Sequence, residues 1–267
     1  MKLLACDLDG TLVDTEKNFI RKDNIDAIKK LRKEGNKFII STGRDLKGLE
    51  SIFNDNAGVE FDYLVLCNGA LILDSNLNLI YKNTLPHDVV KSVYNNIYKS
   101  NNNDDDIAMY VTYEDTSSVF YTGSTGEFKD FLGAFENIND ELDVFSKERE
   151  FNLISVFSKS SNHSAAEKLR EKLVETFGDS YGIFRNQSFV DIVGKDCSKG
   201  SGLKKIFELE NWDINNLYTI GDSYNDISMF NITDNSFTFN HVEDGVKAHT
   251  NNTVDYVYEC IDVILNS

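Results

Sequence analysis

The chain has few basic residues for its size. Among its 267 residues, 27 are lysine or arginine and 44 are aspartate or glutamate, which gives a formal net charge of -17 and an isoelectric point near 4.6. A surface this acidic repels nucleic acid and anionic lipid, so we expect neither as a partner. At long range it would also repel a phosphorylated metabolite, until salt screened the charge over about 8 Å. An enzyme acting on phosphates would therefore need positive charge gathered at its own site.

The sequence also lacks paired cysteines and long apolar runs. The four cysteines, Cys6, Cys67, Cys197 and Cys260, are far apart and form no Cys-x-x-Cys pair. Asp7 interrupts the N-terminal apolar segment too early for a signal peptide, and no apolar run is long enough to cross a membrane. We therefore expect a reduced cytoplasmic protein with no membrane partner. The cysteines are predicted to be small buried hydrophobes at strand ends, with a redox switch as the alternative.

Strand and helix patterns alternate at the beginning of the chain. Apolar runs at residues 3–6, 37–41 and 63–67 predict buried strands, and residues 24–34 and 45–53 have the periodicity of amphipathic helices. This alternation is typical of a parallel sheet with right-handed crossovers. The same alternation returns from residue 200 to the end of the chain, and we find no internal repeat.

The middle of the chain has a different pattern. An expected hairpin over residues 71–81 precedes the only proline, Pro86. After it come alternating segments at 108–113, 118–121 and 151–157, helical segments at 88–99 and 164–177, and a polar run at 101–106 that predicts a loop. Such a mixture favours an α+β insertion with an antiparallel sheet. We therefore predict an α/β protein with two domains. A Rossmann-like parallel-sheet core comprises residues 1–82 and 188–267, and the inserted α+β domain comprises residues 83–187.

Four short motifs stand at predicted strand ends and helix starts. They are Asp7-Leu8-Asp9-Gly10-Thr11-Leu12, Ser41-Thr42-Gly43-Arg44, Lys199-Gly200 and Gly221-Asp222-Ser223-Tyr224-Asn225-Asp226. The carboxyl ends of parallel strands face one crevice, so Asp7, Thr42 and Asn68 are expected at the same edge of the sheet. Carboxylates converging there would repel one another unless a cation lay among them, and hard oxygen ligands suit Mg²⁺. Lys199 and the Thr42 hydroxyl would bind the remaining phosphate oxygens and supply the required positive charge.

The Asp-x-Asp spacing of the first motif suggests two chemical roles. A turn at Gly10 lets the chain curl around a small anion. One carboxylate can then attack phosphorus in line while the other handles a proton at the leaving oxygen.

Each motif also has another interpretation when taken alone. Asp-x-Asp-Gly occurs in calcium loops, although the EF-hand glycine stands sixth and Gly10 is fourth from Asp7. Ser-Thr-Gly-Arg also fits a strand-to-helix turn, Lys199 a solvated lysine, and Asp222 or Ser223 a helix N-cap. The order of all four motifs along the chain favours the catalytic interpretation.

The four motifs together resemble those of haloacid-dehalogenase-superfamily phosphatases. The resemblance is strongest to the Cof-type subfamily of class IIB, which carries a large C2-type α/β cap after the second motif. Cys67-Asn68-Gly69-Ala70 is similar to a further signature of that subfamily, and the resemblance spans nearly the whole chain. It implies that Asp7 is the nucleophile that forms an aspartyl-phosphate and that Asp9 is the general acid/base. It also implies a Mg²⁺ ion held by the Asp7 side chain, the Asp9 backbone carbonyl and the Asp222 carboxylate.

The resemblance also assigns roles around this metal. Phosphate or substrate would be bound by Thr42, the Gly43 amide, Arg44, Lys199 and Asn225. Asp226 would lie behind the metal ligands. For Arg44 there is an alternative role, which is to brace the cap or a neighbouring carboxylate.

Three further residues are candidates for substrate specificity. Many relatives have Asn-Ala where this chain has Asn240-His241, and His241 is expected at the surface or, alternatively, lining the crevice. Arg185 and Asn186 stand close to the return to the core and could reach the substrate. The other histidines show no ligand spacing.

The leading functional hypothesis is a Mg²⁺-dependent phosphatase for a small phosphorylated metabolite, either a sugar phosphate or a phosphorylated cofactor. An inserted cap of this size would close over the site and exclude large substrates. One alternative is phosphotransfer, as in related mutases. Another is a non-catalytic sensor, which would ordinarily have lost Asp7, Asp9 or Lys199. We expect a monomer or a weak homodimer.

Overall fold

The computed structural model describes residues 1–14, 19–55, 58–101, 106–114, 116–133, 135 and 137–267. Two compact units make up the chain, residues 1–82 with 198–267 and residues 83–197, and we call them the core and the cap. The expected return to the core at residue 188 is ten residues too early, since the core resumes at Ser198. The reason is that β13 (Phe189–Val193) pairs with two strands of the cap sheet.

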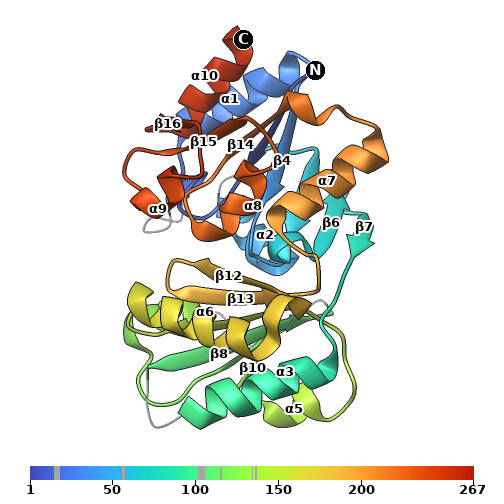
Figure 1. Ribbon diagram of the computed structural model, residues 1–267. Helices are drawn as coiled ribbons and strands as arrows, with labels where there is room; N and C mark the ends of the chain where they lie inside the picture. Colours follow the sequence, from blue (N-terminus) through green and yellow to red (C-terminus); the bar gives the residue numbers. More distant parts are fainter. Residues whose placement is uncertain (15–18, 56–57, 102–105, 115, 134, 136) are drawn as a thin grey trace. The chain divides into compact units, whose positions relative to one another are not determined.

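The core is built on a sheet of eight strands (Figure 1). From one edge to the other they are β16 (Asn252–Val254), β15 (Asn235–Phe239), β14 (Leu217–Ile220), β1 (Leu3–Cys6), β4 (Lys37–Ser41), β5 (Tyr63–Leu66), β6 (Leu71–Asp74) and β7 (Leu79–Lys82). The first six run parallel, and β6 and β7 form an antiparallel hairpin at the edge. Every residue of β1 is buried, which explains its continuous apolar sequence. The predicted α/β fold with a sheet rich in parallel strands is confirmed.

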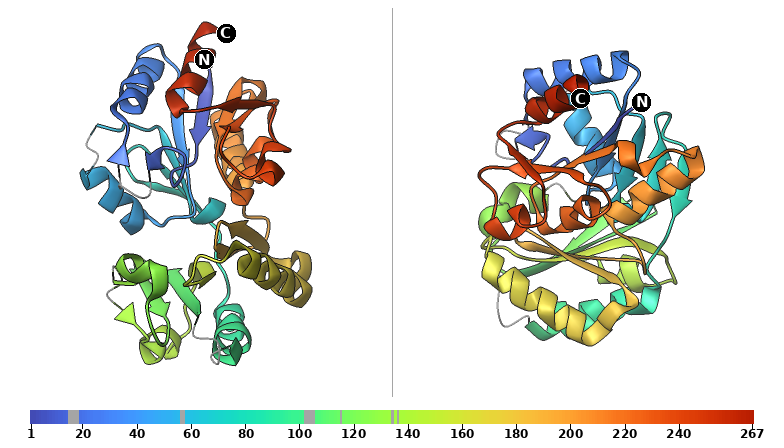
Figure 2. Two further views of the ribbon diagram at one scale, coloured as in Figure 1. Left: turned by 90° about the vertical axis from the view of Figure 1, so that its left-hand side faces the viewer. Right: turned by 45° about the horizontal axis from the view of Figure 1, so that its top comes forward.

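Helices cover both faces of the core sheet (Figure 2). On one face lie α1 (Lys22–Lys33), α2 (Leu46–Asp55) and α10 (Val257–Asn266), and on the other lie α7 (Lys199–Glu210) and α8 (Ile227–Phe230). Helix α7 packs Leu203, Ile206 and Phe207, which recur at helical spacing, against Leu3 and Val65 of the sheet. Three smaller elements complete the core: β2 (Val13–Asp14), β3 (Phe19–Ile20) and α9 (Asp244–Lys247).

The cap contains a separate six-stranded sheet. Its order is β10 (Asn137–Ile138), β9 (Thr116–Phe120), β8 (Ile107–Tyr113), β11 (Phe151–Ser158), β13 and β12 (Gly182–Asn186). The sheet is antiparallel, as expected, except that β10 pairs parallel with β9. The cap helices are α3 (His87–Val93), followed by a π turn over 94–98, α4 (Lys129–Gly133), α5 (Glu141–Phe145) and α6 (His163–Phe177). Of the loop expected at 101–106, residues 102–105 lie outside the described part of the chain.

All four cysteines are buried thiols, as predicted. Cys6 ends β1 and Cys67 directly follows β5, whereas Cys197 lies in the segment after β13 and Cys260 lies within α10. The expected position at strand ends is therefore wrong for Cys197 and Cys260. Within the described residues, no helix combines the length and the apolar character needed to cross a membrane.

Candidate active site

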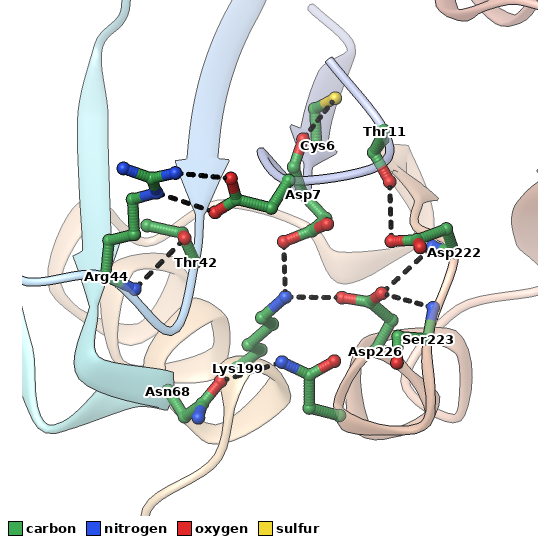
Figure 3. A network of polar contacts seen from close by, with 12 residues as sticks. Cys6, Asp7, Thr11, Thr42, Arg44, Asn68, Lys199, Asp222, Ser223 and Asp226 are labelled. Atoms are coloured by element: carbon green, nitrogen blue, oxygen red, sulfur yellow. Dashed lines mark hydrogen bonds and ion pairs between the residues drawn. The ribbon is translucent and has the colours of Figure 1, made fainter. Parts of the chain in front are cut away.

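Asp7 lies where β1 ends, at the carboxyl edge of the parallel sheet. Its backbone N–H donates to the carbonyl oxygen of Ile220 at 2.9 Å, which ties the loop after β1 to the end of β14. The Asp7 side chain faces Lys199 in Figure 3, and the residue is only 4% exposed. The apolar strand thus brings a carboxylate to a buried position among the other motifs.

The loop after β1 turns tightly at Gly10. This glycine has a φ of 78°, and its N–H donates to the carbonyl oxygen of Val13 at 3.1 Å. A Cβ atom on Gly10 would lie 2.5 Å from Oδ2 of Asp222, so both the backbone conformation and the available space require glycine. The next residue, Thr11, donates its hydroxyl to Oδ1 of Asp222 at 3.2 Å. This turn holds the first motif against the fourth.

Helix α7 begins at the residue that carries the third motif. The Ser198 hydroxyl accepts the N–H of Ser201 at 3.0 Å and caps the helix. A Cβ atom on Gly200 would lie 2.0 Å from the carbonyl oxygen of Ser228, so only glycine allows α7 to approach α8 this closely. The close approach fixes Lys199, the first residue of α7, beneath the end of β1.

The ammonium group of Lys199 lies between two carboxylates. Its Nζ atom is 2.5 Å from Oδ1 of Asp7 and 2.6 Å from Oδ1 of Asp226, and Lys199 is 1% exposed. Burial by itself would lower the pKa of Lys199, but the charges of Asp226 and Asp7 outweigh it, so the pKa is raised. The two carboxylates thus favour the charged form of the buried Lys199 ammonium.

Asp226 is fully buried and uses both of its carboxylate oxygens. Oδ2 accepts the backbone N–H groups of Asp222 and Ser223, each at 3.0 Å, while Oδ1 accepts from Lys199. A Cβ atom on Gly221 would lie 2.4 Å from the Asp226 carboxyl carbon, so the loop closes tightly around this side chain. Asp226 therefore shapes the loop and balances the charge of Lys199.

Three carboxylates form the group that could hold a metal ion in the described chain. Asp7, Asp222 and Asp226 each offer an oxygen, and these oxygens lie within 4.8 Å of one another. Burial, followed by the charge of Asp226, raises the pKa of Asp7 well above its ordinary value and raises the pKa of Asp222 to about 6. A hard divalent cation fits such a donor set, because it would stabilise the charged forms of carboxylates that burial and mutual repulsion disfavour. Since both oxygens of Asp226 are engaged, Asp7 and Asp222 are the better placed side-chain ligands.

The second motif brings Arg44 to Asp9. The guanidinium forms a bidentate ion pair with the Asp9 carboxylate, in which Nε donates to Oδ2 at 2.8 Å and Nη2 donates to Oδ1 at 2.7 Å. Thr42 is buried at the end of β4, and its hydroxyl accepts the backbone N–H of Arg44 at 3.1 Å. Gly43 lies half-buried between them. Arg44 thus contacts a neighbouring carboxylate, which is the alternative role that the sequence left open.

Asn68 and Asn225 join the second and fourth motifs. The side-chain amide of Asn225 donates to Oδ1 of Asn68 at 3.1 Å, and Asn68 donates its backbone N–H to the carbonyl oxygen of Thr42 at 3.0 Å. Asn68 has the left-handed backbone conformation that asparagine tolerates well. Oδ1 of Asn225 is buried and accepts no hydrogen bond from the described residues. It is an acceptor available to a donor group on a bound ligand.

Two of these contacts are not evident from the sequence. Thr11 stands inside the first motif and Asn68 inside the Cof-type signature, but no local pattern indicates a partner for either. The hydroxyl of Thr11 and the amide of Asn68, each close to a strand end, are the only local indications that these residues belong to the site. Their partners, Asp222 and Asn225, are more than 150 residues away in the sequence and could not be found from local pattern.

The three candidate specificity residues are divided between the core and the cap. His241 follows β15, is exposed, and stacks on Phe239 with 5.3 Å between ring centroids. Arg185 and Asn186 end β12 in the cap. Arg185 is buried there, and its Nε atom is 3.2 Å from a carboxylate oxygen of Glu167.

Comparison with known proteins agrees with this fold. The model of the family described as haloacid dehalogenase-like hydrolase matches residues 4–265. The chain belongs to this family. Within it, the chain is a Cof-type phosphatase, that is, a phosphoric monoester hydrolase.

Several relatives resemble the chain over most of its length. Two Bacillus subtilis proteins named 5-amino-6-(5-phospho-D-ribitylamino)uracil phosphatase are 25% identical over 273 residues and 26% identical over 260 residues. The first match covers 92% of this chain and 90% of the relative, and the second covers 96% and 89%. A solved structure of a subclass IIB sugar phosphatase has a TM-score of 0.81 at 22% identity and covers 98% of each chain. At that identity, the likeness shows the fold.

We expect the metal-free protein to lose stability as the pH rises from about 4 to about 6. Asp222 has a pKa of about 6 when folded, against about 3.9 for an unfolded aspartate. The folded state therefore binds the proton more tightly, and raising the pH through this window favours unfolding by up to roughly 3 kcal/mol. Thermal unfolding in a chelator at several pH values, for the protein and for Asp222→Asn, measures the effect.

The Asp222→Asn variant should have a flatter stability profile over this pH window. Mg²⁺ should raise the Tm of the unmodified protein at pH 7 and have much less effect on the variant. Parallel pH profiles for the two proteins would contradict the assignment of this shift to Asp222.

Proposed function

We propose that the chain hydrolyses phosphate monoesters of small metabolites in a Mg²⁺-dependent reaction, with Asp7 as the nucleophile. The observation that carries the proposal is the placement of Asp7. It is buried at a strand end, it is bonded to the Lys199 ammonium at 2.5 Å, and one of its oxygens lies within 4.8 Å of an Asp222 oxygen. A carboxylate so placed is oriented, partly stripped of water and close to positive charge, which are the conditions for attack on a phosphoryl group.

The proposed reaction has two displacement steps. In the first, an Asp7 carboxylate oxygen bonds to phosphorus while the bond from phosphorus to the ester oxygen breaks. The leaving oxygen takes a proton from Asp9, and an aspartyl-phosphate remains. In the second, Asp9 takes a proton from water, the water oxygen bonds to phosphorus, and the bond to Asp7 breaks to release inorganic phosphate.

The remaining residues of the motifs would hold the phosphoryl group. Lys199, the Thr42 hydroxyl and the Gly43 amide would bind its oxygens, Asn225 would contact the substrate, and Asp226 keeps Lys199 in position. The ligands for Mg²⁺ would be the Asp7 side chain, the Asp9 backbone carbonyl and Asp222. When bound, the ion would neutralise charge on the phosphoryl oxygens.

For the substrate, we propose a sugar phosphate or a phosphorylated cofactor or cofactor precursor. Two relatives are named for a phosphorylated ribityl compound, and a structural neighbour is a sugar phosphatase. These share a phosphate ester on a small polyhydroxylated carbon chain.

A panel of phosphate esters tests the proposed function. We expect p-nitrophenyl phosphate to be hydrolysed only with Mg²⁺, and kcat/KM for at least one sugar or polyol phosphate to exceed the aryl value by about tenfold or more. Release of inorganic phosphate is the measurement, with chelator and then restored Mg²⁺ as the control.

Three results would contradict the proposal. Undiminished turnover in chelator would show that the reaction does not depend on Mg²⁺. Phosphate transferred to a second sugar, with a requirement for a bisphosphate activator, would identify a mutase. Stabilisation by phosphorylated ligands with no turnover of any of them would identify a sensor.

A further inference from the structure

The two carboxylates of the first motif are held by two different cations. Asp7 is bonded to Lys199 at the start of α7, whereas Asp9 is bonded to Arg44 in the loop between β4 and α2. In Figure 3, Arg44 and Lys199 approach from these separate elements. The carboxylates of two residues that are only two positions apart are therefore bound to cations on different elements.

Arg44 is anchored independently of Asp9. Its Nη1 atom donates to the carbonyl oxygen of Gly48 at 3.0 Å, and its backbone N–H donates to the Thr42 hydroxyl at 3.1 Å. Its backbone carbonyl accepts the N–H of Cys67 at 2.9 Å. Because the guanidinium is a rigid planar fork with these other attachments, it determines the orientation of the Asp9 carboxylate.

The position of Asp9 matters because a cluster of carboxylates lies close by. Asp7, Asp222 and Asp226 already bring carboxylate oxygens within 4.8 Å of one another, and a fourth carboxylate there would add repulsion. The Asp9 side chain is instead 27% exposed and the Arg44 side chain 33% exposed, so the pair lies toward solvent. Solvent access is what a group that exchanges protons with a leaving group and with water requires.

We propose that Arg44 is a positioning residue that keeps the Asp9 carboxylate out of the metal cluster and oriented for proton transfer to the leaving group. This inference rests on the proposed function, in which Asp9 handles that proton. The competing role, direct binding of phosphate by Arg44, predicts a different kinetic pattern.

The two roles are separated by the leaving group of the substrate. An aryl phosphate such as p-nitrophenyl phosphate leaves with little help from an acid, whereas an alkyl phosphate such as glycerol phosphate needs a proton. For Arg44→Met we expect kcat with the alkyl ester to fall by about 10²-fold, since positioned acids contribute about 10²–10⁴. The aryl kcat should fall much less, and KM should change little for either ester.

Further variants make the test specific. Arg44→Lys keeps the charge but not the fork, so its selective loss should be smaller, and it replaces Arg44→Met if that variant does not fold. Added guanidinium ion at millimolar concentration should restore part of the alkyl activity of Arg44→Ala. Arg32→Met is the matched control, because Arg32 forms a similar fork with Asp62 elsewhere in the core. It should leave the ratio of alkyl to aryl rates unchanged.

Asp9→Asn distinguishes a failure of the acid/base role of Asp9 from a failure of the positioning role of Arg44. A selective loss of alkyl turnover in this variant supports the role of Asp9, and equal losses on both esters overturn that part of the proposed function. If Asp9→Asn is selective but Arg44→Met raises KM for both esters and weakens inhibition by inorganic phosphate, Arg44 binds phosphate and the inference is wrong. The double variant should lose no more alkyl turnover than Asp9→Asn alone.

Discussion

Replacing Asp7 with asparagine is expected to reduce phosphatase activity by about 10⁴-fold or more, because an amide oxygen cannot take the place of a carboxylate that attacks phosphorus. The fold should survive the change. Burial, and then the charge of Asp226, raises the pKa of Asp7, so a neutral side chain of the same shape avoids the cost of a buried charge as well as this repulsion. Lys199 keeps Asp226 as its partner. Initial rates on p-nitrophenyl phosphate with Mg²⁺ and the Tm of both proteins provide the measurement.

The covalent step can be examined in the same pair of proteins. With a phosphate ester labelled on phosphorus, denaturing quench during turnover should leave label on the unmodified chain and none on Asp7→Asn. Asp26→Asn, an exposed change on α1, is the matched control and should behave as the unmodified protein. Substantial turnover in Asp7→Asn would remove the nucleophile assignment, and label retained on that variant would place the phosphoryl group on another residue.

Lys199→Met should have the largest effect on stability. The ammonium is buried between Asp7 and Asp226 at 2.5 Å and 2.6 Å, and its removal leaves two buried carboxylates without a positive partner. Breaking a buried pair in this way costs about 3–5 kcal/mol. Activity should also fall by about 10²–10³-fold, since the proposed donor to the phosphoryl oxygens is lost. Denaturant unfolding measured together with kcat gives both quantities.

Two variants show whether this loss arises from the unpaired carboxylates. Lys204→Met removes an exposed lysine from the same helix and should change stability by less than about 0.5 kcal/mol. Adding Asp226→Asn to Lys199→Met should recover part of the lost stability, because one of the stranded charges is neutralised. A loss below about 1 kcal/mol in Lys199→Met would mean that the lysine is not needed to balance the cluster.

Much of the core could be predicted because its elements follow local patterns. The strand expected at 37–41 coincides with β4, and the helix expected at 24–34 corresponds to α1 at Lys22–Lys33. Both depend on the spacing of apolar side chains over a few turns or a few pleats. The boundary at residue 188 failed for a different reason. Residues 189–193 form a mostly apolar strand, and such a pattern does not tell which of two sheets the strand joins.

Local sequence pattern is enough to show which chemical groups stand at the strand ends. An apolar run followed by Asp-x-Asp-Gly places carboxylates after β1, and this depends only on neighbouring residues. The tertiary structure alone decided which cation serves which carboxylate. Lys199 is 192 residues from Asp7, and Arg44 is 35 residues from Asp9. The choice between these pairings rests on the tight turn at Gly10, the close approach of α7 at Gly200 and the attachments of Arg44, which exist only once distant segments have packed together.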